Sequence, residues 1–479
     1  MRRAPVAAFL AAWILLGAGA ARAEEEGFLG EESAGIVPVT VERRLEISGI
    51  SGEISVTGRP AREIRFRAVS AGDPERDAPV AVFLEEGTLR LRPPNGAGPE
   101  DRKLTIEVPE GLYVAIEAQA SSVTASGLSG GIEVRGSRIE FAGSYLSGGV
   151  VFEIEGGRVS LSGARGQIAA RGRDLEFEGK LLSADVLLGI ARGRATLSGI
   201  TGSVDADLEE VALALEGVSH ATTLRARGGT AKLAGCHGGA TADLSGTLLQ
   251  VSSSRGSFDV ATDSAIRFEG VDGEFHAIVG GGSVVGQGSR GAVRIEATAG
   301  IAVQLHAMRG PVSVTGTGLT VALENVGGEV SLDLMDSSVS VEKAAAAVTI
   351  ASDGGDVAVR GATSGVVVRS RGGSVRLEEI GGPVEVEADG PSVEVSWTAA
   401  PGDRDSRIVN AGGEVAVSFR AGGCRVEAES RRGRIETDIP TIVAIDGSGS
   451  AQGTVGGARR PTVRVEAEGD VFLSGPGGE

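Results

Sequence analysis

Apolar and polar residues alternate along most of this chain in short runs that return at a fixed interval. The clearest sample lies in residues 346–397, where VTIASDGGDVAVRGA, VVVRSRGGSVRLEEI and VEVEADGPSVEVSW follow one another. Counted from the first apolar residue, columns 0, 2, 9 and 11 are apolar, as Val348, Ile350, Val357 and Val359 show. Two short strands joined by a Gly-rich corner and repeated every 18 residues indicate a stacked β-coil, because each unit buries its apolar face only against its neighbours.

The same template extends over residues 112–397, with column 14 also apolar. Its members include Val114, Ile116, Val123, Ala125 and Leu128, then Val150, Phe152, Val159, Leu161 and Ala164, then Val186, Leu188, Ala195, Leu197 and Ile200. We therefore predict an all-β fold, a single-stranded right-handed parallel β-helix (β-solenoid) with coils of about 18 residues. The right hand follows from the handedness of parallel crossovers. A left-handed hexapeptide helix would require an aliphatic residue every sixth position, which these columns do not provide.

Glycine or another small residue marks one corner of most coils. These corners fall near 131, 149, 166, 184, 202, 220, 238, 256, 273, 291, 310, 328, 347, 365 and 382, at intervals of 16 to 19 residues. Because a one-residue slip would turn each inward set outward, the drift must be absorbed at the turns, where glycine accepts a positive φ. The pattern is weakest around Phe258, Phe275 and 280–282, where we expect bulges or a bend.

Changes in this pattern divide the chain into five parts. We assign 1–23 as a signal peptide, 24–35 as a flexible acidic leader, 36–111 as an N-terminal β-subdomain or cap, 112–397 as the repeat array, and 398–479 as irregular C-terminal coils and a cap. Polar loops are expected at 92–103 and 398–407, and a Gly/Ser-rich loop at 440–461. The caps would cover strand edges that otherwise invite end-to-end association.

The N-terminal segment has the features of a secretory signal. Arg2 and Arg3 precede an apolar run, and Ala21-Arg22-Ala23 resembles a cleavage site, so the mature chain should begin near Glu24. An uncleaved anchor is the alternative, which the short run disfavours. We expect an exported protein of the periplasm or the cell surface, with no transmembrane segment after cleavage, since no later run reaches 18 apolar residues.

Composition narrows the range of partners. Removal of residues 1–23 deletes three arginines and no acid, so the formal charge becomes 43 − 64 = −21. Such an acidic body repels nucleic acid, and we expect no nucleic-acid partner. Glycine is abundant at 76 residues, yet 41% of the chain is hydrophobic, which is too much for a disordered tract. We expect a monomer that meets an unknown envelope, glycan or protein partner.

Three segments resemble the bacterial putative-adhesin family, exported β-strand-repeat proteins that form a domain of unknown function. They are LEISGISGEISVTG at 45–58, LTIEVPEGLYVAIEA at 104–118, and the closing VRVEAEGDVFLSG at 463–475. The resemblance covers most of the mature chain. It implies a right-handed β-solenoid outside the cytoplasm and brings no functional residues to transfer.

Two motifs match catalytic patterns by their letters alone. Residues 127–131 fit G-x-S-x-G and residues 286–291 fit the dinucleotide pattern G-x-G-x-x-G. Both chemistries require a strand, a turn and a helix, and no helical pattern follows either motif. A solenoid corner is therefore the favoured interpretation of both.

The remaining candidates are thiols and imidazoles. Cys236 and Cys424 occupy columns 14 and 9, so we expect two buried thiols far apart in the array rather than a disulfide or a nucleophile. His220 and His237 should lie near one corner of neighbouring coils, where a metal pair is an alternative to two solvated side chains. His276 and His306 are isolated.

The outward acids complete the search for a site. Glu385, Glu387 and Glu394 are interspersed with arginines, as on a soluble surface. The sequence therefore assigns no catalytic, cofactor-binding or metal-ligating residue and no cofactor. We predict an exported non-enzymatic β-solenoid, an adhesin or a cell-envelope scaffold. The alternatives are a carbohydrate-active enzyme on a β-helix and a mechanical spacer without a ligand.

Overall fold

The structure is a computed structural model that describes residues 27–39, 44–94, 101–398, 404–445, 449–456 and 461–475. All regular elements in these ranges are β-strands, which confirms the all-β prediction. The predicted signal peptide lies outside the described residues. The chain forms two compact units, the first ending at Glu140 and including Leu146–Gly149, the second made of Phe141–Tyr145 and the residues from Val150 onward. Each unit is described by itself.

The first unit is built from nine strands and most of a tenth. They are β1 (Gly27–Glu32), β2 (Ala34–Pro38), β3 (Arg44–Arg59), β4 (Glu63–Ser70), β5 (Asp73–Asp77), β6 (Val80–Glu85), β7 (Thr88–Arg92), β8 (Arg102–Pro109), β9 (Tyr113–Ser126) and β10 (Ile132–Ser144).

The second unit contains the repeat array. Its strands are β11 (Gly149–Ser162), β12 (Arg165–Ile200), β13 (Val204–Val218), β14 (Thr222–Ala234), β15 (Ala240–Ser245), β16 (Leu248–Ser252), β17 (Phe258–Thr262), β18 (Ile266–Glu269), β19 (Phe275–Val279), β20 (Ser283–Gln287), β21 (Val293–Ala297), β22 (Ala302–His306), β23 (Val312–Thr317), β24 (Thr320–Val326), β25 (Val330–Met335), β26 (Ser338–Ala344), β27 (Val348–Asp353), β28 (Val357–Arg360), β29 (Val366–Arg371), β30 (Val375–Ile380), β31 (Val384–Asp389) and β32 (Ser392–Trp397). The irregular C-terminal part adds β33 (Ser406–Asn410), β34 (Glu414–Phe419), β35 (Cys424–Ser430), β36 (Ile435–Thr437), β37 (Ile442–Ile445), β38 (Ser450–Val455), β39 (Thr462–Ala467) and β40 (Val471–Ser474).

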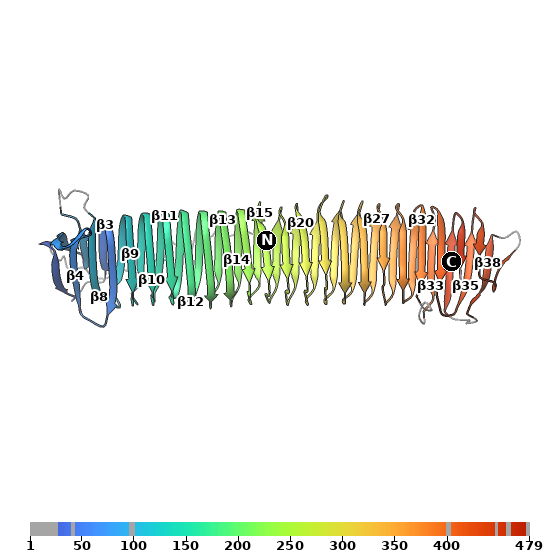
Figure 1. The fold of residues 1–479 in the computed structure, drawn as a ribbon, viewed down its shortest axis with the longest axis horizontal. Helices are drawn as coiled ribbons and strands as arrows, with labels where there is room; N and C mark the ends of the chain where they lie inside the picture. The colour runs from blue at the N-terminus through green and yellow to red at the C-terminus, as the bar shows by residue number, and fades with distance from the viewer. Residues whose placement is uncertain are drawn as a thin grey trace. The chain divides into compact units, whose positions relative to one another are not determined.

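Each coil of the array contributes one strand to each of two parallel ladders. Odd-numbered strands from β15 to β33 pair in one ladder, sheet A, and even-numbered strands from β16 to β34 pair in the other, sheet B. Figure 1 shows strands of consecutive coils side by side. The register Val348↔Val366 and Val357↔Val375 places equal columns of adjacent coils opposite each other. This parallel β-solenoid with a spacing near 18 residues confirms the predicted fold class.

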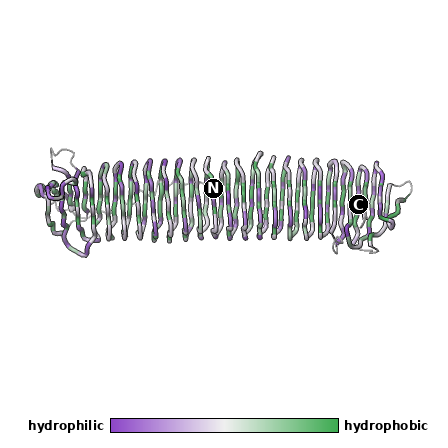
Figure 2. The backbone as a smooth tube through the Cα atoms, viewed as in Figure 1, coloured by the Kyte–Doolittle hydropathy of each residue, from purple (hydrophilic) through white to green (hydrophobic). Residues whose placement is uncertain are grey.

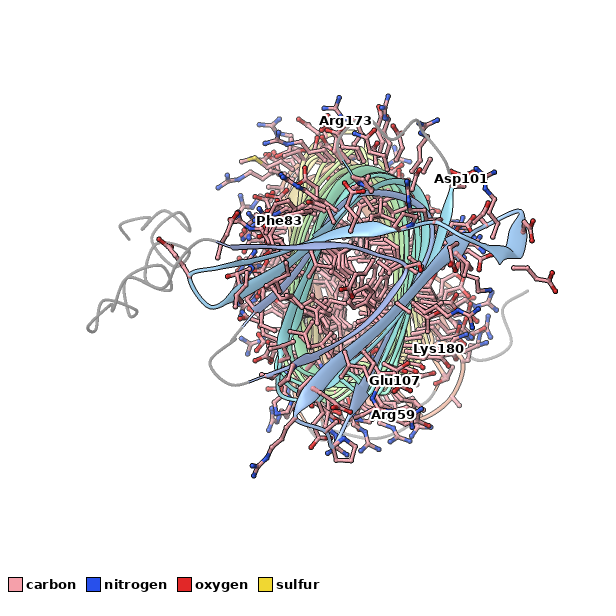
Figure 3. The ribbon with its side chains drawn as sticks, turned by 90° about the vertical axis from the view of Figure 1, so that its left-hand side faces the viewer. Arg59, Phe83, Asp101, Glu107, Arg173 and Lys180 are labelled. Atoms are coloured by element: carbon pink, nitrogen blue, oxygen red, sulfur yellow. The ribbon has the colours of Figure 1, made fainter. Side chains whose placement is uncertain are left out.

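The apolar columns form a continuous core between the two sheets. Val348, Ile350, Val357 and Val359 are at most 1% exposed, and hydropathy alternates along the strands in Figure 2. The rings of Phe268 in sheet B and Phe275 in sheet A stack with centroids 4.1 Å apart. Figure 3 shows carbon filling the interior, while the charged groups of Arg173 and Lys180 lie outside.

Departures from the 18-residue period occur between strands. Leu244 pairs with Thr262 but Leu249 pairs with Ile266, so the turn at 263–265 is one residue shorter than its predecessor. Residues 298–301 form a turn one residue longer, because Val279 pairs with Ala297 whereas Val284 pairs with Val303. The drift is therefore absorbed at turns, as predicted. The ladders through Phe258 and Phe275 record no bulge, so that expectation was wrong: a shortened turn preserves the alternation.

The expected reason for the corner glycines was only partly correct. Gly256 does have a positive φ, of 88°. Six others have no left-handed φ, yet an added Cβ would lie 1.8 to 2.5 Å from backbone atoms of the preceding coil; these are Gly202, Gly238, Gly291, Gly310, Gly328 and Gly382. Close stacking of backbone on backbone, rather than dihedral freedom, excludes a side chain at these positions.

Left-handed residues instead form a ladder at another corner, where glycine is optional. Its members are Tyr145, Gly163, Leu181, Gly199, Gly217, Gly235, Ser253, Gly270, Gly288, Ala307, Asn325, Lys343, Gly361 and Glu379. Side chains are tolerated here because they point to solvent; Tyr145 and Leu181 are 77% and 74% exposed. The fold imposes the left-handed conformation at this corner whatever residue occupies it.

At the N-terminal end of the first unit, parallel pairing gives way to antiparallel pairing. Strand β3 pairs in parallel with β9 on one side and with β7 and β8 on the other. Antiparallel β6 and β4 then cover β7 and β8, and β1 and β2 cover β6 and β4 in turn. Within the segment expected to be a flexible leader, residues 27–32 thus form a strand, and Phe28 packs on Phe83 at 5.1 Å. Backbone pairing organises this stretch despite its acidic side chains; residues 24–26 lie outside the described residues.

The C-terminal end contains a similar change of direction. Strand β38 pairs antiparallel with β35, and β37 pairs antiparallel with β38. Both lie within 440–461, which the sequence predicted to be a loop. Their glycines and serines hid two short strands whose partners are distant in sequence. The polar loop predicted at 398–407 ends earlier, because β33 begins at Ser406; residues 399–403 lie outside the described residues.

Candidate functional site

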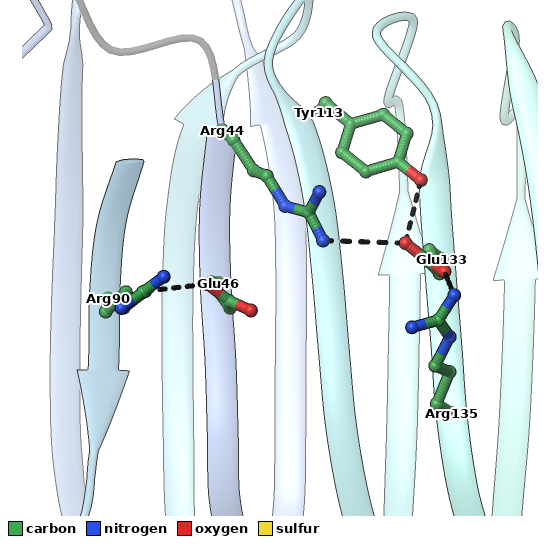
Figure 4. Close-up of polar contacts among 6 residues, drawn as sticks. All are labelled: Arg44, Glu46, Arg90, Tyr113, Glu133 and Arg135. Carbon is green, nitrogen blue, oxygen red and sulfur yellow. Dashed lines mark hydrogen bonds and ion pairs between the residues drawn. The ribbon is translucent and has the colours of Figure 1, made fainter. Parts of the chain in front are cut away.

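One cluster of polar side chains in the first unit is packed more closely than the surface around it. Glu133 accepts a hydrogen bond from the Tyr113 hydroxyl at 3.1 Å and forms ion pairs with Arg135 at 2.5 Å and Arg44 at 3.6 Å (Figure 4). Although Glu133 occupies an outward column, its side chain is only 12% exposed. The guanidinium carbon of Arg44 also lies 5.4 Å from the centre of the Tyr113 ring.

Three strands position this cluster. Arg44 opens β3, and its Cα is the direct register partner of Tyr113 at the start of β9. Glu133 and Arg135 follow on β10, two residues apart and therefore on one face of the strand. The cluster thus joins three strands through charge-assisted hydrogen bonds around one carboxylate.

The electrostatics of this cluster favour a static role. Burial, and then the charge and hydrogen bonding of Glu133, raise the pKa of Tyr113 to about 12. The phenol therefore stays protonated at neutral pH and serves as a hydrogen-bond donor, unlike an activated base or nucleophile, whose pKa lies near the working pH. We assign the cluster to the joining of β3, β9 and β10.

Sequence reasoning missed this cluster. Arg44 and Tyr113 are 69 residues apart because β4 to β8 intervene between β3 and β9. No multiple of the repeat predicts that separation. The one local signal was an acid and an arginine, Glu133 and Arg135, on the same face of one strand.

In the second unit, outward charges pair between adjacent coils. Arginine lies close to a carboxylate one or about one repeat away in Arg158–Glu176 at 2.6 Å, Arg192–Asp174 at 2.9 Å, Arg376–Glu394 at 2.9 Å, Arg360–Glu379 at 3.0 Å and Arg407–Glu387 at 3.1 Å. These are cross-strand pairs of opposite charge on exposed ladders. Each adds little to stability in water, but together they produce faces of alternating sign.

The outward acids noted in the sequence do not converge. Glu385 and Glu387 lie on β31 in sheet A, whereas Glu394 lies on β32 in sheet B. Glu387 lies 3.7 Å from Arg369 and 3.1 Å from Arg407, and Glu394 hydrogen-bonds to Arg376. Paired carboxylates on different sheets do not form the facing pair that glycoside hydrolysis requires.

Both catalytic-looking motifs belong to packing. Leu128 is buried, and Ser129 donates its hydroxyl hydrogen bond to the carbonyl of Glu110 at 2.9 Å. In the second motif, Gly286 leaves room for the Phe268 ring, which lies 2.2 Å from the position of a Cβ. Buried Ser289 donates to the carbonyl of Val271 at 2.9 Å. Each hydroxyl satisfies a backbone carbonyl of the preceding coil.

The two cysteines are buried and unpaired, as expected from their columns. Burial raises the pKa of Cys236, and it raises the pKa of Cys424 to about 11. The thiolate, which is the reactive form, is therefore disfavoured at both positions. These thiols behave as small apolar side chains.

The histidines occupy the outer surface. His220 and His237 lie at one corner of neighbouring coils, where Gly238 approaches the backbone of His220. His276 contacts Asp259 at 3.0 Å and Glu296 at 3.4 Å, and His306 contacts Glu324 at 3.3 Å. Among the residues that the structure describes, no group of three or more His, Cys, Asp or Glu side chains is arranged to hold a metal ion.

Comparisons with known proteins add little to these observations. No family model matches the chain, and no curated protein matches it either. A solved structure described as a putative cell adhesion protein from Clostridium sporogenes is 8% identical, and the alignment covers 93% of this chain and 99% of that one. Its TM-score of 0.14 means that the two chains do not superpose, so this similarity carries no argument. In the part of the chain that the structure describes, no helix has the length and hydropathy to span a membrane.

Proposed function

We propose that this protein is an exported, non-catalytic β-solenoid that presents its outward faces to a partner in the cell envelope or on a cell surface. The observation that carries the proposal is the regular alternation of opposite charges on both sheets. Pairs such as Arg376–Glu394 in sheet B and Arg407–Glu387 in sheet A repeat at the spacing of the coils. A rigid face that repeats one small motif suits multivalent binding of an extended partner, because weak contacts then add along the ladder.

Export and adhesion rest on the sequence. The predicted signal at 1–23 and the resemblance to the bacterial putative-adhesin family support them. A carbohydrate-active enzyme on the same fold is the competing proposal, and it rests on analogy of fold alone.

A pair of face-specific variants tests the proposal. One variant carries Arg376→Ser and Glu394→Ser in sheet B, and its matched control carries Arg407→Ser and Glu387→Ser in sheet A. Both remove one exposed pair, so we expect each to fold like the parent. On glycan arrays and intact bacterial cells, we expect one variant to lose about tenfold or more in binding and the other to change little.

The same samples are incubated with the glycans of the array to detect cleavage. Binding that depends on one face, without new glycan fragments, supports the proposed function. Release of fragments, or binding to neither glycans nor cells by the parent, contradicts it.

A further inference from the structure

The order of the coils in space differs from their order along the chain at the C-terminal end. Strand β39 lies between β33 and β35 and pairs in parallel with both, through Val465↔Ile408 and Ala428↔Val465. Strand β40 lies in the same way between β34 and β36. The last coil in sequence is therefore inserted between two coils that precede it.

The inserted pair satisfies two edges at once. Every strand edge presents a row of N–H and C=O groups, and β39 meets such a row on each side. Its inward residues Val463 and Val465, with Val471 and Leu473 of β40, are at most 2% exposed. Outside, Arg464 donates to Glu427 at 3.1 Å. We define the space between coil β33–β34 and coil β35–β36 as the strand slot.

The strand slot selects its occupant by chemistry. It requires a strand pair that runs parallel to both neighbours and has apolar residues at alternating positions, as in VRVEAEGDVFLSG. An inward charge would be buried without a partner. The backbone edges and the core pocket do not depend on which molecule supplies the strands.

The connection from β38 to β39 crosses β35. Val455 in β38 pairs with Cys424 on one side of β35, whereas Thr462 in β39 pairs with Arg425 on the other side. Two strand spacings correspond to about 9.6 Å, and residues 456–461 cover that distance. This connection decides whether β39–β40 fill the slot of their own chain.

We propose that the strand slot is an acceptor site through which two copies of this chain join by exchanging β39–β40. The contacts in the slot are the same whether the strands come from the same chain or from another. The balance between the closed monomer and the exchanged dimer is then set by the connection and by protein concentration. This inference is independent of the proposed binding function, since it concerns only association of the chain with itself.

Shortening the connection tests the proposal in the full chain. If residues 456–461 are deleted, Val455 and Thr462 become adjacent, about 3.8 Å apart, and cannot flank β35 within one chain. We expect a dimer of twice the parent mass that keeps the parent's β-type circular dichroism. The matched control deletes residues 400–403 between β32 and β33, which lie in consecutive coils, and we expect it to stay monomeric. A monomer with exposed β39–β40 in the first variant would overturn the proposal.

A second experiment decides the matter if the deletion variant is insoluble. A protease site is placed between Gly456 and Pro461 of the full chain, which is cut, unfolded and refolded with an excess of fluorescent peptide covering residues 461–475. We expect stoichiometric incorporation of this peptide. A control peptide with Val463→Asp and Val465→Asp should be incorporated about tenfold less or worse, because both side chains face the core. Failure of the first peptide to enter, or equal entry of both, refutes an acceptor site.

Discussion

At the scale of single residues, this fold uses glycine for two different reasons. At one corner, Gly291 and its equivalents lie against the backbone of the preceding coil. At another, left-handed φ values recur, and residues as large as Leu181 and Lys343 occupy them because their side chains extend into solvent. The available space, more than the dihedral angle, therefore decides which glycines are indispensable.

This difference gives a direct prediction for the corner glycines. We expect Gly291→Ala to destabilise the protein by about 3 kcal/mol, because its Cβ would lie 1.8 Å from the carbonyl oxygen of Gly273, which the coil holds in place. Gly327→Ala is the matched control, since its nearest neighbour is 3.6 Å away and its φ is not left-handed. Chemical denaturation of both variants measures the effect. Equal stability of the two would contradict the close-approach argument.

The Tyr113 phenol gives a prediction for alkaline pH. In a Tyr145→Phe variant, which leaves Tyr113 as the only tyrosine, we expect the phenolate absorbance to appear with a midpoint near pH 12. Because the folded pKa exceeds the ordinary value near 10, the contribution of Tyr113 to stability is fully present below pH 10 and is lost as the pH rises through 12.

Glu133→Gln separates the causes of this shift. It removes the carboxylate charge but leaves the phenol partly buried, so the midpoint should fall only part of the way toward 10. A parent midpoint near 10 would show that the cluster does not form in solution.

At the scale of elements, the unit of construction is the coil. Adjacent coils pair column by column, and turns of 17-, 18- and 19-residue coils differ while the strands keep their alternation. Since each coil contacts only its neighbours, removal of a complete coil should leave the remaining interfaces intact.

We therefore expect deletion of residues 348–365 to yield a folded protein. The deletion brings Val330 and Val366 into the register that Val330 and Val348 now share. Circular dichroism and thermal unfolding should resemble those of the parent, within a few degrees.

The control for this deletion removes far less of the chain. Deletion of Thr349 alone shifts the rest of β27 by one position and directs Asp353 toward the core. We expect this single deletion to lower the unfolding midpoint more than loss of the whole coil does. The opposite order would mean that register is not what holds the coils together.

At the scale of the whole molecule, the ends pose a different problem from the array. A parallel stack always leaves an unpaired edge, which would recruit further strands. The first unit covers β7 and β8 with antiparallel strands, and the second covers β35 with antiparallel β38. In both places a coil also lies out of sequence order: β7 and β8 lie outside β3, and β39–β40 lie inside β35–β36.

The sequence alone determined the array. Alternation and an 18-residue period predicted the parallel coils, the inward positions of Cys236 and Cys424, and the structural role of the motifs at 127–131 and 286–291. Such features are predictable because each residue's environment is set by its column, and the column can be counted along the chain.

Only the tertiary structure decided the ends, the cluster around Glu133 and the order of the last coils. Strands β35 and β39 have the same alternation, so either could follow β33, and the pattern does not reveal which one does. Arg44 meets Tyr113 because β4 to β8 leave the stack and return outside β3. Edges are satisfied by whichever strand reaches them, and that depends on three-dimensional closure rather than on a period in the sequence.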